Sequence, residues 1–397
     1  MERIVSAIIN TLSRELGPDL ENAYLYGSMV LRTYEMGESD INLLLITSDN
    51  VNMHQLRAVF YPLWQEYGRQ LKRAPLVATR SQLARHFLLN PAFAHHLIED
   101  GQPLINTSGL LAELPSPPEL APPDKYAALA HEVMLASTVL ASQPWPSDQA
   151  AAQRRKLHGL ARRIFREPIN PQETAVTTFA RIQAYLAPKI KALPIEHPWE
   201  SMRTATSPLL PGLQATYTKD LEKILLVFNQ LTPEQLQAIS WDKLAVRLAK
   251  DYKGIYVTSS PQLRLIHQYE TPLDLVFRRS KRTWGMDPLA DIPATNYYKL
   301  RQTARIPSHI LIDSLPNAYL TQDETEFGKI IHDFQNKMLN VQLETELLSR
   351  MNLIGQTRPL MPLPGREAPP QTRIDAIFNL LNWWAEQLTN AMQQAAA

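Results

Sequence analysis

Cysteine is absent from the 397 residues of this chain. Its absence excludes disulfide bonds, a thiolate nucleophile and any metal site built on cysteine. Acidic and basic residues nearly cancel to a formal net charge of +1, so the whole chain has no general attraction for nucleic acid or for an acidic partner. No apolar run reaches the roughly 20 residues that a membrane-spanning helix needs. We therefore expect a cytoplasmic protein with no membrane partner.

Glycine is scarce as well, with 13 residues against 31 prolines. The prolines cluster at residues 114–123 and 359–370. Such segments favour extended backbone and act as semi-rigid spacers, so they are predicted domain boundaries. The first residues place Ile4, Ile8 and Leu12 at helical spacing, with charged residues between them. This pattern predicts an amphipathic helix rather than a signal peptide or a membrane anchor.

Residues 22–46, NAYLYGSMVLRTYEMGESDINLLLI, are the most informative part of the chain. The pattern predicts a strand at 23–26, a Gly27-Ser28 turn, a helical segment and a second strand at 41–46. Side chains two positions apart on a strand share a face, so Asp40 and Asn42 should point the same way. Glycine lets backbone approach a ligand closely, and amides after Ser28 would suit a phosphate. The stretch therefore predicts a ligand site.

This stretch resembles the signature of the nucleotidyltransferase superfamily related to DNA polymerase β, in which Gly-Ser precedes Asp-x-Asp by about ten residues. Residues 76–105 are similar, more loosely, to the segment that follows the core strands in bacterial aminoglycoside-type nucleotidyltransferases. The resemblance implies Mg²⁺ and ATP or another nucleoside triphosphate as cofactors, with two cations held by three carboxylates. It implies that Gly27 and Ser28 bind the nucleotide, and that Asp40 is catalytic and binds metal together with Asn42.

Two positions depart from that pattern and leave the activity open. Asn42 stands where the second aspartate is expected, and the predicted third strand, 75–79, carries no acid. One interpretation is an impaired or inactive nucleotidyltransferase fold, retained to bind a nucleotide or a protein partner. The alternative is an active Mg²⁺-dependent enzyme that modifies a small-molecule or protein hydroxyl and uses another acid, such as Glu35 or Glu38.

The same pattern recurs when the chain is shifted by 232 residues, which lays Tyr24 on Tyr256 and Ser28 on Ser260. The shift predicts a tandem duplication and an intramolecular pseudo-dimer. In this second copy Ser260 is the expected nucleotide-binding residue. Asp274, which aligns with Asn42, is the expected metal ligand, with Asp313 near a further strand at 309–312.

The predicted fold class is therefore α/β (α+β), with two nucleotidyltransferase-like mixed-sheet domains, each followed by helices. The predicted domains are 1–113, a helical domain at 124–230, the second copy at 235–320 and C-terminal helices at 321–397. Apolar positions such as Phe334, Met338 and Trp384 predict buried faces on those last helices. The basic residues at 278–282 lack interleaved stacking aromatics, so we expect a solvated loop and no nucleic-acid partner.

Overall fold

The computed structural model describes residues 2–30, 34, 39–105, 110–141, 147–167, 169–170, 172–193, 210–219, 223–270, 281–292, 296–352, 354 and 363–396. The chain is mixed α/β and divides into two compact units. Unit 1 combines Met1–Glu119 with Lys299–Ala397, and unit 2 is Leu120–Tyr298. The predicted division at 113, 235 and 321 differs from this one, because the C-terminal helices complete the core of the N-terminal segment.

Unit 1 is built on a four-stranded sheet with the order β3-β2-β1-β4. The strands are β1 (Leu20–Tyr26), β2 (Asn42–Thr47), β3 (Leu76–Thr79) and β4 (Gln102–Pro103). β1 is antiparallel to β2 and to β4, whereas β2 is parallel to β3. The run Leu43–Ile46 is buried throughout, as expected for a strand covered on both faces.

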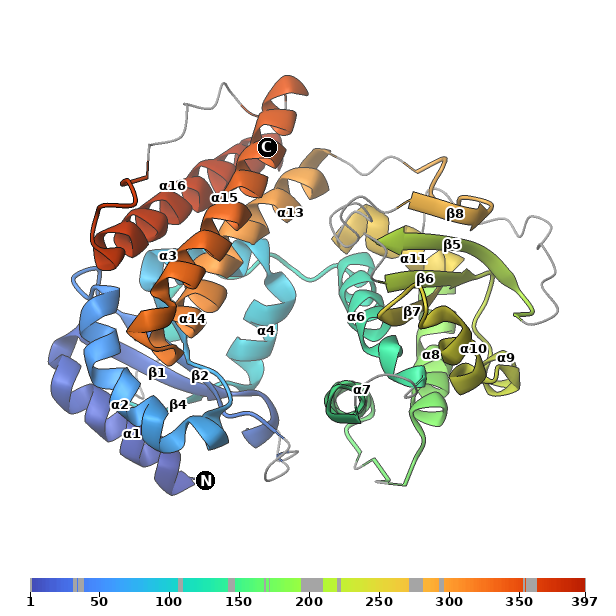
Figure 1. Cartoon of the computed structure of the whole chain (residues 1–397), viewed down its shortest axis with the longest axis horizontal. Coiled ribbons are helices and arrows are strands. Elements are labelled where there is room, and N and C mark those ends of the chain that lie inside the picture. Colours follow the sequence, from blue (N-terminus) through green and yellow to red (C-terminus); the bar gives the residue numbers. More distant parts are fainter. Residues whose placement is uncertain are drawn as a thin grey trace. The chain divides into compact units, whose positions relative to one another are not determined.

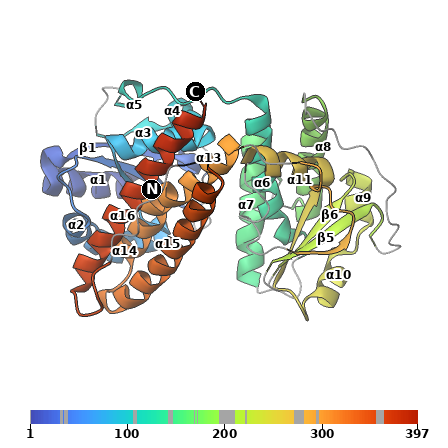
Figure 2. The same cartoon turned by 90° about the horizontal axis from the view of Figure 1, so that it is seen from above.

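Helices cover this sheet and come from both ends of the chain (Figure 1). They are α1 (Glu2–Leu16), α2 (Met53–Leu71), α3 (Arg80–Leu89), α4 (Pro91–Asp100), α5 (Leu110–Glu113), α13 (Asn296–His309), α14 (Leu315–Thr321), α15 (Phe327–Arg350) and α16 (Pro370–Ala396). Capping boxes at Asn52 and Thr79 start α2 and α3, and α3 follows directly after the last residue of β3. Figures 1 and 2 both show α15 running beside α16, and α14 packs on α2.

The predicted apolar faces of the C-terminal helices are confirmed, since Phe334, Met338 and Trp384 are all buried. The predicted strand at 309–312 is wrong. These residues end α13 and enter the π-helix η5 (Ile310–Ser314), which leads directly into α14. Pro316 explains the wider turn, because its ring removes an amide donor and crowds the carbonyl one turn earlier. The β-branched run therefore lies inside a helix rather than in a sheet.

Arg57 on α2 links the two chain segments of unit 1, because it contacts residues of the C-terminal segment. It is 7% exposed and lies 4.3 Å from the ring centroid of Tyr61, 5.3 Å from that of Tyr319 and 4.7 Å from that of Phe327. Its guanidinium also donates a hydrogen bond to the carbonyl oxygen of Tyr319. The buried charge is thus accommodated by ring faces and a backbone dipole from α14 and α15.

Replacing Arg57 with Ala is expected to lower the free energy of unfolding by about 3 kcal/mol, because packing, cation–π contacts and a buried hydrogen bond are lost together. Chemical denaturation, with hydrogen exchange of the α2 amides as the readout, measures this loss of stability. Arg69→Ala on the exposed face of the same helix is the control and should cost less than about 0.5 kcal/mol. Equal losses of unfolding free energy in the two variants would show that the contacts of Arg57 do not stabilise unit 1.

Unit 2 contains a sheet with the order β7-β6-β5-β8. Its strands are β5 (Leu213–Lys219), β6 (Lys223–Phe228), β7 (Gly254–Ser259) and β8 (Lys281–Gly285). Its helices are α6 (Pro122–Ala136), α7 (Ser147–Phe165), α8 (Ala175–Lys191), α9 (Pro233–Ala238), α10 (Trp241–Leu248) and α11 (Ser260–Leu265). β5 and β6 fall inside the range 124–230 that was predicted to be a helical domain, so the end of that range is a sheet instead.

The two sheets share strand order and direction, but not in the register of the 232-residue shift. β5 is antiparallel to β6 and β8, and β6 is parallel to β7, as in the β1-to-β4 sheet. Tyr24 therefore lies on an inner strand, whereas Tyr256 lies on the edge strand β7 that corresponds to β3. The predicted equivalence of these two tyrosines is wrong. Fifteen residues separate β1 from β2, and three separate β5 from β6.

Candidate functional site

The turn after β1 brings Gly27 against the first residue of β2. Tyr26 and Asn42 are paired across the antiparallel ladder, so the chain leaves β1 beside the start of β2. Gly27 has a φ of +78°, and a Cβ built on it would lie 2.8 Å from Asn42 Nδ2. A side chain here would be strained and would also displace the asparagine. The glycine is thus required by both the turn and the close approach.

Asp40 and Asn42 share one face of the strand, as their spacing predicts. Asn42 Nδ2 donates a hydrogen bond to Asp40 Oδ1 over 3.4 Å, and both side chains are half-buried. Ser28 follows in the short 3₁₀ turn η2 (Gly27–Met29) and is half-buried. The structure therefore brings Gly27, Ser28, Asp40 and Asn42 into one corner of unit 1. Glu35 and Glu38 lie outside the described residues.

Gly27→Ala is expected to cost about 1–2 kcal/mol in backbone strain and roughly a further 1 kcal/mol when Asn42 is pushed off Asp40. Gly17→Ala is the matched control. Its φ is +57°, but a Cβ there would meet no atom within 4 Å, so only the strain is expected. Urea unfolding of the two variants measures the difference. Equal costs would show that the contact between Gly27 and Asn42 contributes nothing.

The positively charged Arg73 lies just before the third strand, for which the family resemblance predicts a carboxylate. Arg73 lies just before β3, which has no acidic residue, and its guanidinium donates to Asp313 Oδ1 of η5. The next amide, that of Ala74, donates to Asn317 Oδ1 over 2.8 Å and fixes the start of the strand. Sequence reasoning missed this pair, because its partners are 240 positions apart.

The charges around Asp40 shift the pKa values of Arg73 and Tyr26. Burial opposes the charge on Arg73, but the carboxylate of Asp313, then Tyr26 and Asp40, outweigh burial and raise the pKa of Arg73. Burial raises the pKa of Tyr26 well above its usual value; Arg73 opposes this shift, while Asp313 and Asp40 add to it. Tyr26 is therefore a neutral hydroxyl among two carboxylates and one guanidinium.

This donor set does not fit a pair of divalent cations. Asp40 lies two residues before the first residue of β2, and the amide nitrogen of Asn42 already donates to its carboxylate. Within the described part of the chain, no group of three or more His, Asp or Glu side chains could hold a metal ion. Asp274, the other expected ligand, lies outside the described residues. Arg73 adds positive charge at the same corner, which further disfavours a second cation.

The residues expected in the second copy do not form an equivalent site. Ser260 is fully buried and begins α11 after β7, so it follows the counterpart of β3 rather than that of β1. Its position therefore contradicts the predicted equivalence of Ser260 and Ser28. The connection between β5 and β6 has no room for a Gly-Ser turn followed by Asp-x-Asn. Arg278 and Arg279 of the basic segment lie outside the described residues.

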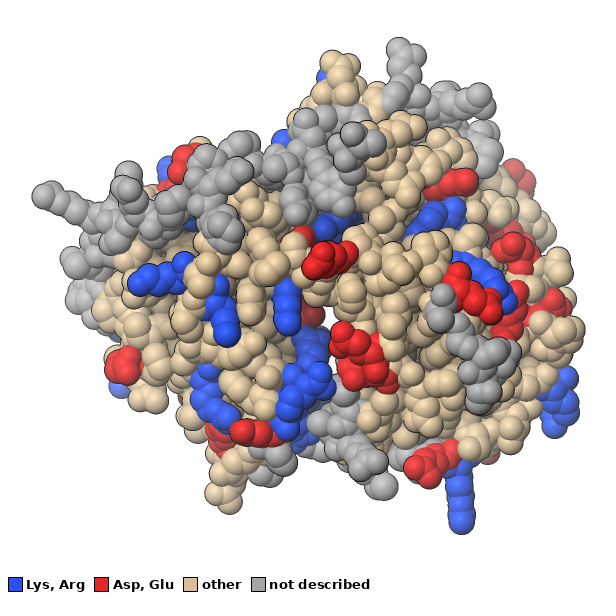
Figure 3. Space-filling model, turned by 180° about the vertical axis from the view of Figure 1, so that it is seen from behind, with Lys and Arg blue, Asp and Glu red and all other residues tan. Residues whose placement is uncertain are grey.

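Neither the surface charge nor similarity to known proteins indicates what this site binds. On the face shown in Figure 3, Lys and Arg side chains have Asp and Glu side chains among them, and neither sign covers it alone. Among the described residues, no helix is both long enough and apolar enough to cross a membrane. No protein-family model matches this chain. No curated protein matches it either.

Proposed function

We propose that unit 1 is a nucleotidyltransferase-like domain that binds a nucleotide but has lost metal-dependent transfer. The support comes from the corner built by Gly27, Asp40 and Asn42, where the missing Cβ of the glycine lets the turn pack against Asn42 beside a half-buried carboxylate. The helix–strand–turn–strand order of the N-terminal segment agrees with the resemblance drawn from the sequence. Unit 2, with the same strand order and a shortened first connection, is then a second and more degenerate copy.

The presence of Arg73 beside Asp40 is the observation that carries this proposal. Asp40 and Asp313 contribute two negative charges, and Arg73 contributes one positive charge, so their sum is −1. Two divalent cations would raise that sum to +3 before any phosphate binds. Two-metal transfer needs carboxylates that offset the cations and hold both of them. The guanidinium instead supplies a fixed positive charge in the place of a metal.

Arg73 can serve a phosphate without a metal ion. One of its terminal nitrogens is taken by Asp313, and the side chain remains 30% exposed. An arginine has five donors in a planar fork, so its remaining N–H groups can face a phosphate oxygen. Nucleotide binding is therefore expected to survive chelation of Mg²⁺. Transfer is not expected, because Arg73 disfavours the two cations that would lower the pKa of an attacking hydroxyl.

The test combines calorimetry with ATP, in Mg²⁺ or in EDTA, with turnover of labelled ATP using a panel of hydroxyl acceptors. We expect heat in both buffers and no transfer. Arg73→Ala should weaken binding about tenfold through loss of a charge-assisted hydrogen bond, whereas exposed Arg69→Ala should leave it unchanged. Absence of heat in both buffers would refute nucleotide binding. Mg²⁺-dependent transfer that is lost in Asp40→Ala would instead establish a working enzyme.

A further inference from the structure

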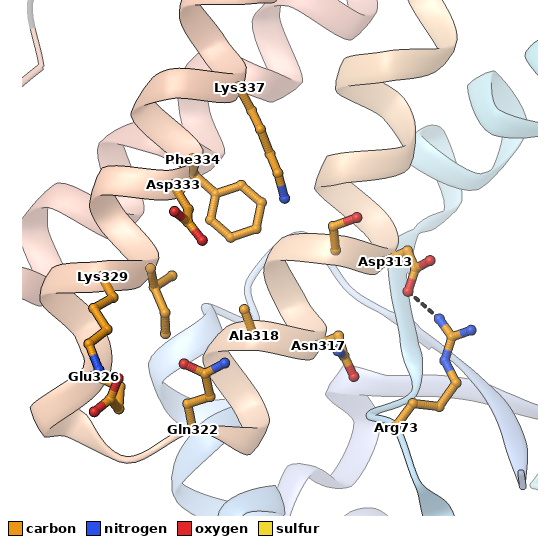
Figure 4. Close-up of a pocket in the computed structure, with 12 residues that line it drawn as sticks. Arg73, Asp313, Asn317, Ala318, Gln322, Glu326, Lys329, Asp333, Phe334 and Lys337 are labelled. Atoms are coloured by element: carbon orange, nitrogen blue, oxygen red, sulfur yellow. Dashed lines mark hydrogen bonds and ion pairs between the residues drawn. The ribbon is translucent and has the colours of Figure 1, made fainter. Parts of the chain in front are cut away.

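Unit 1 contains a cavity of about 630 Å³ between α14, α15 and the segment before β3 (Figure 4). Arg73 and Asp313 form the wall nearest Asp40, and Asn317 lies beside them. The opposite wall is α15, with Asp333, Phe334 and Lys337. The cavity is thus a separate space that shares one wall with the corner proposed to bind a nucleotide.

Charges of both signs line this cavity in equal number. The cations are Arg73, Lys329 and Lys337, and the acids are Asp313, Glu326 and Asp333. Two ion pairs are formed inside the wall, one between Arg73 and Asp313 and one between Lys329 and Glu326 over 2.6 Å. A lining with no net charge does not attract a polyanion such as a second nucleotide.

One acid and one cation remain available to a ligand. Among the described residues, neither Asp333 nor Lys337 has an ion-pair partner, although they lie one helical turn apart. Lys337 Nζ instead lies 4.3 Å from the ring centroid of Phe334. Figure 4 shows the carboxylate of Asp333 and the ammonium of Lys337 on the cavity side of α15, with the phenyl ring between them.

We propose that this cavity binds a small zwitterion of the α-amino-acid class. Its carboxylate pairs with Lys337 and its ammonium with Asp333, while its carbon skeleton lies against Phe334 and Ile330. Residues one turn apart on a helix place their Cβ atoms about 5–6 Å from each other, which suits opposite charges separated by one carbon. The side-chain amide of Asn317 provides a further donor, because its oxygen is already bound to the amide of Ala74. This goes beyond nucleotide binding and does not depend on it.

Calorimetry and saturation-transfer NMR with each of the twenty free amino acids test the proposal on the full chain. At least one amino acid should bind saturably, and its N-acetyl and carboxamide derivatives should bind about tenfold more weakly, since each loses one charged contact. No binding by any free amino acid at about 10 mM would overturn the proposal, because even millimolar affinity would be detected there. Equal binding of the blocked derivatives would overturn it as well.

Two variants, each at an exposed side chain, assign the two charged contacts. Asp333→Asn should abolish discrimination against the N-acetyl derivative, and Lys337→Gln should abolish discrimination against the carboxamide. His332→Gln, at an exposed position on the same helix, is the control and should retain both. Retained discrimination in both cavity variants would overturn the proposal. Loss of ATP binding in Lys337→Gln would also overturn it, since the cavity would then belong to the nucleotide site.

Discussion

Acidification from pH 6.5 to pH 3 is expected to remove about 4 kcal/mol from the stability of unit 1 through His86 alone. This histidine on α3 is 6% exposed, and burial, followed by the charges of His309 and Arg305, lowers its pKa to about 3. Its Nδ1 lies 2.9 Å from Ser308 Oγ, and the ring of Phe93 meets it edge-on at 5.4 Å. The imidazole is therefore held neutral in the folded state.

Unit 1 loses stability on acidification because the unfolded chain then binds more protons than the folded chain does. Above pH 6.5 His86 is neutral in both folded and unfolded chains, and its contribution is constant. Between pH 6.5 and 3 the unfolded chain binds a proton that the folded chain does not, so each pH unit costs about 1.4 kcal/mol. Below the folded pKa of about 3 both states are protonated, and no further loss arises from this group.

Hydrogen exchange of the α3 amides as a function of pH measures this loss within unit 1. His86→Gln removes the titrating group while keeping a polar side chain toward Ser308, so it should be less stable at pH 7 but flatter between pH 6.5 and 3. His332→Gln, at an exposed position, should keep the steep dependence. An unchanged slope in His86→Gln would show that another group is responsible.

Local features of unit 1 could be predicted from sequence because they depend on neighbours along the chain. Strand periodicity located β1 and β2, and the two-residue period placed Asp40 and Asn42 on one face. The Gly27-Ser28 turn follows β1 as expected, and the amphipathic helix expected from Ile4, Ile8 and Leu12 is α1. Each of these depends on backbone preferences that act within about ten positions.

Arg73 and Asp313 could not be paired from sequence, because nothing local links the start of β3 to a π-helix near the other end of the chain. The 232-residue register was misleading for a related physical reason. Amphipathic helices and buried strands repeat similar apolar patterns, so Tyr24 and Tyr256 matched although they lie on non-equivalent strands. Strand order, rather than residue identity, relates the two sheets, and it becomes visible only once pairing is known.

The second large effect is expected from reversing the charge at position 73. Arg73→Asp would set a third carboxylate beside Asp40 and Asp313, which changes the sum of these charges from −1 to −3. Three carboxylates at close range repel one another, so the variant should be less stable than the unmodified protein when Mg²⁺ is absent. Hard cations bind such oxygen ligands, and binding only to the folded state should restore stability by about 2.7 kcal/mol at a hundredfold excess over the dissociation constant.

The melting temperature of Arg73→Asp should therefore rise with Mg²⁺ concentration, whereas that of the unmodified protein should not. Arg73→Asn is the matched control: it removes the same cation without adding a carboxylate, so it isolates the effect of the third acid. If the proposed function is correct, ATP binding should also become Mg²⁺-dependent in the aspartate variant, because the phosphates lose Arg73 and gain a metal ion instead. A Mg²⁺ response of equal size in Arg73→Asn would show that Asp40 and Asp313 suffice for a metal. Arg73 would then act only by repelling Mg²⁺, and not by taking its place beside a phosphate.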